Sequence, residues 1–511
     1  MKGIFMNDTP LKLNAKRTIL VGLAFFLIMA FWQAYDTIIP KILTDKFGMA
    51  QWLSGVIMAL DNVLALFLLP FFGALSDKCK HKSGKRTPFI FIGTLLSCLA
   101  IVGIICSDMV QSDRLSAVDP QNPTALQTLY EADPEIRVEG KKGALSSFIE
   151  EEDFLSLTDP ESEDYTTYVV SARGAYAAAQ SRRSPAPLIF FVLTLFFVLL
   201  AMGLFRSPAV ALMPDVTPKP LRSKGNAVIN LLGACGTVSL IGIGMLFGTG
   251  KAENALSPYG GYFAALAGVM LAALLVFLFT VKEPLWAREA EAQDRLLEGT
   301  EENEEGDRRL SKGEKRSLIL LLASVALWYM GFNAVTTKFS VYAAPVLNMD
   351  FNSAMLVAQI AGLASFLPAG MIATRIGRKR SILIGVAMLG SAMAVMALVT
   401  KQTPAFLPIA CFIVAGLGWG MINVNSFPMV VELAKGGSVG KYTGYYYTAS
   451  MAAQTVTPVF SGALMDLDMR TLFPYSALFV ALSFLTMLFV KHGDSKPVRK
   501  QSVLEQMDVG D

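Results

Sequence analysis

The chain has 511 residues, of which 53% are hydrophobic and only 17% are charged, and its mean hydropathy is +0.48. Soluble domains carry about 25% charged residues, so this composition excludes a soluble protein. The net charge of +3 is too small to indicate a nucleic-acid-binding protein, and we expect no nucleic-acid partner.

The reactive side chains argue against an enzyme and against a metal site. The five cysteines are scattered and odd in number, which predicts neither a disulfide framework nor a metal pair, and there are only two histidines. The chain has no Ser-His-Asp set and no HExxH motif, and Gly248–Lys251 lacks the other residues of a phosphate-binding loop. We therefore expect no catalytic residues, no metal ligands and no cofactor.

Long apolar segments follow one another along the chain, and each is long enough to cross a bilayer of about 30 Å as a helix. They are residues 18–40, 51–75, 88–107, 187–213, 225–248, 259–281, 318–345, 352–374, 381–399, 404–431, 442–463 and 471–490. The sequence therefore predicts an all-α membrane protein with twelve spans.

Lysine and arginine are distributed unequally between the two predicted faces. With the amino terminus inside, the inner segments carry 30 basic residues and the five short outer loops carry 5. Because basic loops stay on the cytoplasmic side, we expect both termini to be cytoplasmic. The expected location is the plasma or inner membrane, with the protein embedded in the lipid bilayer.

Two polar segments interrupt the series of spans. Residues 108–184 form an outer insert between spans 3 and 4, with 15 acidic and 7 basic residues. Its composition suits either short helices over the outer mouth or partial disorder, and a solvated insert without a transport role is an open alternative. Residues 282–317 form a charged inner linker, and residues 491–511 form an inner tail.

The linker divides the spans six and six. The amino-terminal half comprises residues 1–107 and 185–281, and the carboxy-terminal half comprises residues 318–490. Span 2 ends near Gly73 and Asp77 before the turn Gly84-Lys85-Arg86, while span 8 ends near Gly370 and Arg375 before Gly377-Arg378-Lys379. This repetition predicts two six-helix pseudo-repeats, the layout of many transporters.

Several ionisable residues lie inside the predicted spans, where they are costly and indicate function. Asp61 is near the middle of span 2, too far from either end for its carboxylate to extend to the water at a membrane surface. It must therefore face the bundle interior, where it can exchange a proton. Asp36 is the second candidate for proton coupling, although Lys41 at the outer interface offers it another partner. We expect Glu432 and Lys441 to form a structural ion pair on the inner face.

Amides, charges and aromatic rings in the spans form an inventory that suits a sugar, which needs paired hydrogen bonds and ring stacking. Any one of these residues can instead serve only helix packing. The candidate substrate-binding residues are Trp32, Gln33, Asn62, Arg206, Asn333, Lys338, Gln359, Asn423, Asn425 and Gln454.

The loop after span 2, from Gly73 and Asp77 through Gly84-Lys85-Arg86 to Pro88-Phe89, resembles the cytoplasmic signature of the major facilitator superfamily. Its ending is closer to the sucrose–proton symporters and the related glycoside–pentoside–hexuronide:cation symporters. Trp32-Gln33 in span 1 and the segment from Ser207 to Asp215 at the end of span 4 are similar to the same group.

The resemblance implies the major facilitator fold, a central sugar site and a cation-coupled inward step. It also implies an inner gate of charged residues that holds the outward-facing state. The gate candidates are Asp77, Lys85, Arg86, Asp215 and Arg375.

Two departures from the family pattern bear on the mechanism. The sucrose-type arginine is replaced by Val210, and Arg206 lies one turn earlier on the same helix face. Ala65 and Leu69 stand where a sodium-coupled relative has carboxylates, which favours a proton as the coupling cation.

We therefore predict a proton-coupled importer of a sugar or glycoside that works by alternating access as a monomer. Sodium-coupled sugar symport on the same fold remains an alternative. Efflux of lipophilic compounds is a second alternative, but exporters carry a Gly-Pro-rich motif in span 5, and the segment from Asn230 to Gly236 has glycines without proline.

Overall fold

The computed structural model describes residues 13–138, 140–160, 162–298, 310–433 and 439–494. The predicted tail beyond residue 494 and linker residues 299–309 lie outside the described residues. The chain divides into two compact units, one of Met1–Met49 with Leu60–Asn303 and one of Ala50–Ala59 with Glu304–Asp511. The boundary between the units therefore passes through the second long helix.

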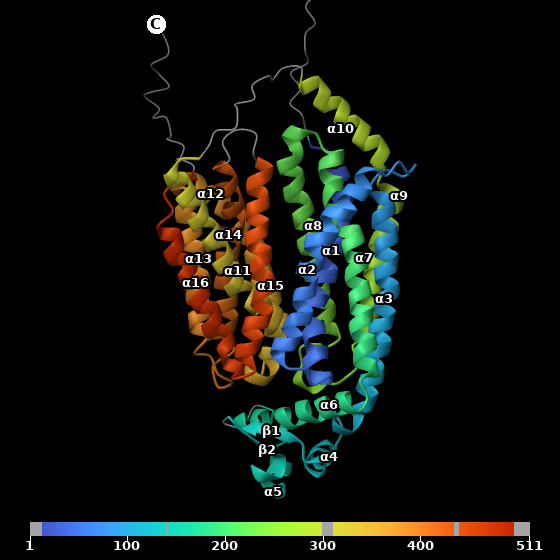
Figure 1. The fold of residues 1–511 in the computed structure, drawn as a ribbon, viewed down its shortest axis with the longest axis vertical. Coiled ribbons are helices and arrows are strands. Elements are labelled where there is room, and N and C mark those ends of the chain that lie inside the picture. Colours follow the sequence, from blue (N-terminus) through green and yellow to red (C-terminus); the bar gives the residue numbers. More distant parts are fainter. Residues whose placement is uncertain (1–12, 139, 161, 299–309, 434–438, 495–511) are drawn as a thin grey trace, which may run out of the picture. The chain divides into compact units, whose positions relative to one another are not determined.

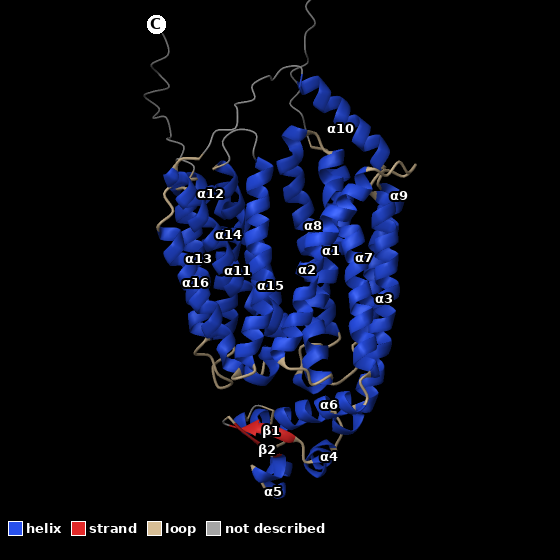
Figure 2. Ribbon diagram, viewed as in Figure 1, coloured by secondary structure: helices blue, strands red, loops and turns tan. Residues whose placement is uncertain are grey.

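The first unit contains the long helices of the amino-terminal half (Figures 1 and 2). They are α1 (Ala15–Lys41, continued by the π-helix η1, Ile42–Lys46), α2 (Gln51–Asp77), α3 (Thr87–Arg114), α7 (Ala186–Val216), α8 (Arg222–Leu246), α9 (Gly260–Thr280) and the linker helix α10 (Glu283–Glu298). Helix α2 belongs to this unit only from Leu60 onward.

The second unit contains the six long helices of the carboxy-terminal half. They are α11 (Lys312–Leu347), α12 (Phe351–Ile376), α13 (Arg378–Met396), α14 (Phe406–Glu432), α15 (Val439–Met465) and α16 (Leu472–Leu488). Helix α11 begins at a capping box in which Ser311 and Glu314 satisfy each other's backbone amides.

Corresponding helices pack together in the two units. Helix α1 contacts α8 and α9, just as α11 contacts α15 and α16. Helix α3 contacts α7 and α9, just as α13 contacts α14 and α16. The two halves therefore share one packing scheme, as the repeated glycine and basic turns predict.

Every predicted span contains a long helix, but not every helix is equally apolar. Within the described residues, ten helices are long and apolar enough to cross a membrane, and the bent α12, with a 48° angle between Phe351–Phe366 and Pro368–Ile376, makes an eleventh. Helix α15 does not pass this test, because its tyrosine, threonine, serine and glutamine side chains lower its mean hydropathy. The protein is thus all-helical in its membrane part, while the number twelve and the cytoplasmic termini stay predictions.

The outer insert is a folded module that belongs to the first unit. It contains η2 (Ser116–Val118), α4 (Ala125–Ala132), the antiparallel hairpin β1 (Glu135–Val138) with β2 (Lys141–Ala144), η3 (Leu145–Ser147), α5 (Glu151–Ser156), η4 (Tyr165–Val170) and α6 (Ser171–Arg183). Leu129, Leu145, Phe154 and Val169 are fully buried in its own core, together with Leu256 from the α8–α9 connection. Of the two structural alternatives for this segment, the short helices are the one observed.

Candidate functional site

Three charged side chains from three helices come together inside the first unit. Asp36 of α1, Asp61 of α2 and Arg206 of α7 interact electrostatically, the two carboxylates repelling each other and Arg206 attracting both. Lys41, the other partner considered for Asp36, pairs instead with Asp45 at 3.2 Å. The structure therefore brings together the two candidates for proton coupling and the candidate arginine.

A small cavity of about 10 Å³ lies between these helices, a size at which a protein begins to hold a single water. Its lining includes Trp32, Asp61, Leu68, Gly203 and Arg206. A Cβ at Gly203 would lie 2.7 Å from Leu68 Cδ1 and 3.1 Å from its Cβ, so glycine allows close packing there. Helices α2 and α7 thus approach closely beside Asp61.

Neighbouring groups orient the charges around the cavity. The amide of Asn62 donates to Asp61 Oδ1 at 2.8 Å, and the guanidinium of Arg206 lies 5.1 Å from the centre of the Trp32 ring. The buried Trp32 Nε1 has no hydrogen-bond partner within the described structure. Gln33 is half-buried on the same helix.

This arrangement suits proton binding. Two carboxylates beside one arginine carry a net charge of −1, and uptake of one proton removes both that charge and the repulsion between the carboxylates. Arg206 also presents a planar donor over an aromatic ring, a combination that binds oxygen-rich ligands.

Two candidates in the second unit join helices, and a third is hydrogen-bonded within its own helix. Lys338 is fully buried, and its ammonium donates to the Gln51 carbonyl at 2.7 Å at the start of α2. Asn425 donates to Ser381 Oγ at 3.0 Å and so joins α14 to α13. Gln454 donates to the carbonyl of Ser450 within its own helix at 3.3 Å. The contacts of Lys338 and Asn425 are the interhelical packing role that polar side chains often have in membranes.

No interhelical hydrogen bond of the other candidate amide side chains of this unit is found among the described residues. Asn333, Gln359 and Asn423 are half-buried on α11, α12 and α14. The buried Asn333 Oδ1 accepts no hydrogen bond within the described residues, so it has capacity for a ligand donor.

Aromatic side chains gather on α11, α14 and α15 in the second unit. Phe332 and Trp419 stack in parallel with ring centres 3.6 Å apart, and Tyr329 meets Trp419 edge-on. Tyr446 is hydrogen-bonded to Ser426 at 3.0 Å. Sequence reasoning missed Tyr329 and Phe332. Tyr329 lies four residues before Asn333 and Phe332 lies four residues after Trp328, so each pair shares a face of α11.

The gate candidates of the first unit form a charged corner at its predicted inner end. Arg86 donates to Asp215 of α7 at 2.7 Å, to Asp77 of α2 at 2.5 Å and to Ser76. Burial lowers the pKa of Arg86, but its hydrogen bonds and charge pairs with Asp215 and Asp77 outweigh this and raise it. Arg86 therefore stays charged and is not a proton switch. Lys85 beside it is exposed.

A carboxylate that sequence reasoning missed completes this corner. Glu283, at the start of α10, is buried and accepts from the Arg86 amide at 2.9 Å and from the Thr87 amide at 2.8 Å. It thus caps the amino end of α3, where negative charge is favourable. Gly84 has φ +114°, and a Cβ there would lie 2.2 Å from the Glu283 carboxyl carbon, so only glycine fits.

The second unit repeats the same arrangement. Arg378 pairs with Glu432 at the end of α14, and Asp494 accepts from the Lys379 amide at 3.1 Å at the start of α13. Gly377, with φ +91°, stands beside Asp494 as Gly84 stands beside Glu283. Glu432 therefore pairs with Arg378 and not with Lys441, whose ammonium lies over the Tyr445 ring. Arg375 is exposed.

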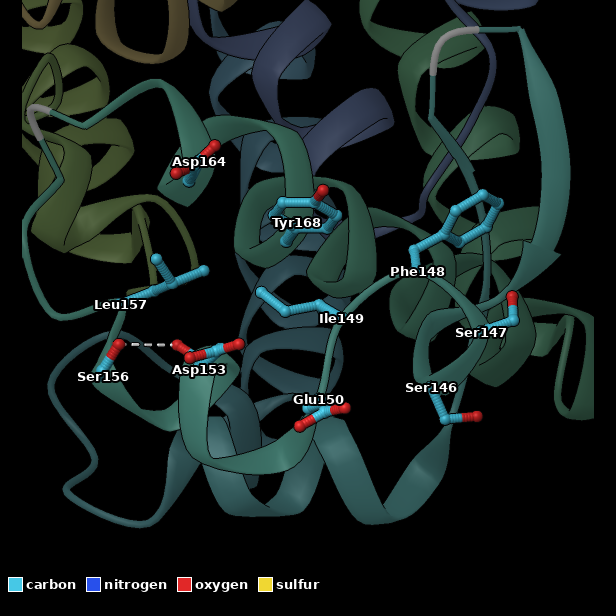
Figure 3. Close-up of a pocket in the computed structure, with 10 residues that line it drawn as sticks. All are labelled: Ser146, Ser147, Phe148, Ile149, Glu150, Asp153, Ser156, Leu157, Asp164 and Tyr168. Carbon is cyan, nitrogen blue, oxygen red and sulfur yellow. Dashed lines mark hydrogen bonds between the residues drawn. The ribbon is translucent and has the colours of Figure 1, made fainter.

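A separate open groove of about 680 Å³ lies in the outer insert (Figure 3). Figure 3 shows the Tyr168 and Phe148 rings and the carboxylates of Glu150, Asp153 and Asp164 around it. Among the described residues that line it there is no lysine or arginine. The groove is distinct from the cavity beside Asp61.

Known structures share the fold of the whole chain. The E. coli xylose transporter XylE in an inward-open conformation aligns with a TM-score of 0.61 at 14% identity, over 96% of this chain and 99% of that one. A bacterial homologue of the iron transporter ferroportin aligns with 0.60 at 13% identity, over 94% and 100%. The nucleoside transporter NupG aligns with 0.55 at 13% identity, over 93% and 100%. At such identities the likeness shows the fold alone.

Sequence profiles identify the family. The Major Facilitator Superfamily profile matches residues 166–456 and 367–506, and the MFS/sugar transport protein profile matches residues 20–115. A comparison with curated proteins gave no match. The first profile covers more than half of the chain, which agrees with the duplicated helical units. The chain belongs to the Major Facilitator Superfamily and is a multi-pass membrane transporter, not an enzyme.

Proposed function

We propose that the protein imports a sugar or glycoside together with a proton, by alternating access, across the plasma or inner membrane. The observation that carries this proposal is the group of Asp36, Asp61 and Arg206 beside a cavity in the first unit. Support for a sugar comes from the family profile over residues 20–115 and from the aromatic and amide side chains of both units.

In the proposed cycle, Asp61 takes up a proton from outside, with Asp36 as the second carboxylate that can share it. Protonation removes the net negative charge between α1, α2 and α7, so the amino-terminal half can repack with substrate bound. Arg206 then acts on the substrate hydroxyls, because one of its two carboxylate partners is neutral.

The gate belongs to the same proposal. The pairs of Arg86 with Asp77 and Asp215, and of Arg378 with Glu432, fix the inner corners of the two units while the protein faces outward. Asp77 keeps 63% of its side chain exposed, so it can change partner when the unit repacks. Such pairs bias an equilibrium only if they differ between the two states.

Sodium-coupled symport is the first competing function. Sodium prefers a cage of oxygen ligands, and the charge of Arg206 beside both carboxylates opposes a second cation there. Efflux of lipophilic compounds is the second competitor, and it needs the opposite direction of substrate movement.

Purified protein in vesicles with an imposed pH gradient, alkaline inside, tests the proposal. We expect a panel of labelled sugars and glycosides to include one that accumulates at least several-fold, and an uncoupler to abolish the accumulation. Accumulation driven by a sodium gradient at equal pH would favour sodium coupling. Extrusion of a lipophilic dye without uptake of any sugar would favour efflux.

A further inference from the structure

Lys46 is a buried charged residue outside the proposed proton site. Its side chain is fully buried at the end of η1, and its ammonium donates to Asp108 Oδ1 at 2.5 Å, to Ser112 Oγ at 2.9 Å and to the Ser257 carbonyl at 2.8 Å. It also lies 4.1 Å from the centre of the Tyr259 ring. All three protons of the ammonium are therefore used.

Asp108 is equally well satisfied. Its second oxygen accepts from the Tyr259 amide at 2.6 Å, and its side chain is fully buried. We call Lys46, Asp108, Ser112, Ser257 and Tyr259 the brace. The brace joins the end of α1 to the base of the outer insert and to the α8–α9 connection, whose Leu256 lies in the core of the insert.

The chain that leaves the brace runs directly against the insert. Gln111 donates to the Lys46 carbonyl at 2.8 Å. Gly48 has φ +63°, and a Cβ there would lie 2.2 Å from the Ala178 amide nitrogen and 2.6 Å from the Gly174 carbonyl, both on α6. The corner between α1 and α2 is thus held on α6 by backbone contact.

Beyond this corner, the chain joins the second unit at Ala50. The amides of Gln51 and Trp52 donate to the two carboxylate oxygens of Asp466 at 2.7 and 2.9 Å, and Lys338 donates to the Gln51 carbonyl at 2.7 Å. We call Gln51, Trp52, Lys338 and Asp466 the latch. Asp466 satisfies amides at the start of α2 that no helical carbonyl can reach.

Tight packing reinforces the latch. A Cβ at Gly55 would lie 2.1 Å from the Pro458 carbonyl oxygen, and a Cβ at Gly462 would lie 2.4 Å from that of Gln51. The first turns of α2 and helix α15 therefore touch backbone to backbone, as small residues allow in membrane helices.

Five residue steps separate Lys46 from Gln51, so even a fully extended chain between them is only about 17 Å long. Gly48 turns this segment back on α6, so it has little slack. We propose that Lys46 and Asp108 are positioning residues for the outer latch, and that through them the outer insert sets how readily the amino end of α2 leaves Asp466. The consequence for transport rests on the proposed function, because release of this end is then part of opening toward the outside.

Hydrogen–deuterium exchange of the full-length protein tests the brace without any transport assay. The variant K46M/D108L removes both charges at nearly constant volume, which spares the protein a lone buried charge. We expect the amides at the start of α2 to exchange about tenfold faster, and G48A to act in the same direction. D466N, which removes the charge and one of the two acceptor oxygens of the latch, sets the largest expected increase.

The matched control is K142Q/E135Q, which removes an exposed ion pair of the same insert at its hairpin. Its exchange at the start of α2 should equal that of the wild type. Exchange in K46M/D108L equal to that of the wild type would overturn the proposal, whether or not D466N exchanges faster. So would an equal increase in the control, because any disturbance of the insert would then suffice.

Transport kinetics separate a positioning role from a merely structural one. A weaker latch populates the outward-open state, so the apparent KM for external sugar should fall about threefold in K46M/D108L at similar Vmax. A structural defect alone lowers Vmax and leaves KM unchanged, which would contradict the proposal. Absence of sugar transport in the wild type would count against the proposed function and not against the brace, which the exchange measurement tests independently.

Discussion

At the scale of single residues, the account depends on Asp61 more than on any other side chain. It is one of two carboxylates that share Arg206, and it alone of the two lines the cavity. The Asn62 amide donates to its Oδ1, and its side chain borders the cavity, where a proton or a substrate can reach it. A substitution that removes only the charge of Asp61 can therefore be told apart from one that removes the whole side chain.

The first prediction concerns D61N. The substitution keeps size and one acceptor but cannot bind a coupling proton, so uptake driven by a pH gradient should fall at least tenfold. Counterflow exchange of sugar, which needs no net proton movement, should persist. D45N is the control, because Asp45 pairs with Lys41 away from the cavity. Full pH-driven accumulation by D61N would remove Asp61 from the mechanism.

The second prediction concerns Arg206. R206K keeps the charge but loses the planar group beside the Trp32 ring, 5.1 Å away. A cation–π contact contributes about 0.5–2 kcal/mol, so we expect KM for the sugar to rise about two- to thirtyfold. Labelled-sugar uptake at several concentrations measures this. An unchanged KM would place Arg206 outside the substrate site.

At the scale of elements, the inner corners explain the repeated glycines of the sequence. Gly84 and Gly377 both have positive φ, and each stands against a carboxylate that caps the next helix. The sequence shows the two turns because they are local patterns. It does not show Glu283 or Asp494 as partners, because Glu283 lies 197 residues from Arg86 and Asp494 lies 115 residues from Lys379.

The third prediction concerns G84A. A side chain there both strains the backbone and meets the Glu283 carboxylate, which should destabilise this unit by about 1–3 kcal/mol. The midpoint of thermal unfolding of the purified protein should therefore fall. G268A on α9 is the control, because a Cβ there meets nothing within 4 Å. Equal midpoints for the two variants would contradict the assigned role of Gly84.

The fourth prediction concerns D77A and uses Cys79 as a native reporter. Cys79 is half-buried in the loop between Asp77 and Arg86. With the other four cysteines replaced by alanine, D77A should raise the rate of Cys79 alkylation from the inner side about threefold, because Arg86 loses one of its partners. An unchanged rate would count against the gate. E291Q, on the exposed face of α10, is the control.

At the scale of the whole molecule, the lengths of the apolar segments predict the helices, because bilayer thickness constrains every span in the same way. The repeated glycine and basic turns predict the duplication, and the resemblance of the loop after span 2 indicates the family. The interior contacts are less accessible to such reasoning. Lys338 is a charged residue inside a span, which predicts a substrate ligand. Its ammonium instead donates to the carbonyl of Gln51, which lies 287 residues earlier in the chain. The outer insert has no periodic pattern, yet Phe154 and Val169 bury a core within it.

The most direct test of the central claim is the movement of protons with sugar. Vesicles containing the purified protein and a trapped pH indicator start with equal pH on both sides, and the transported sugar is then added outside. The account predicts acidification of the lumen that follows sugar entry with the wild type and is absent with D61N. Sugar entry without acidification, or equal acidification with both proteins, would contradict it.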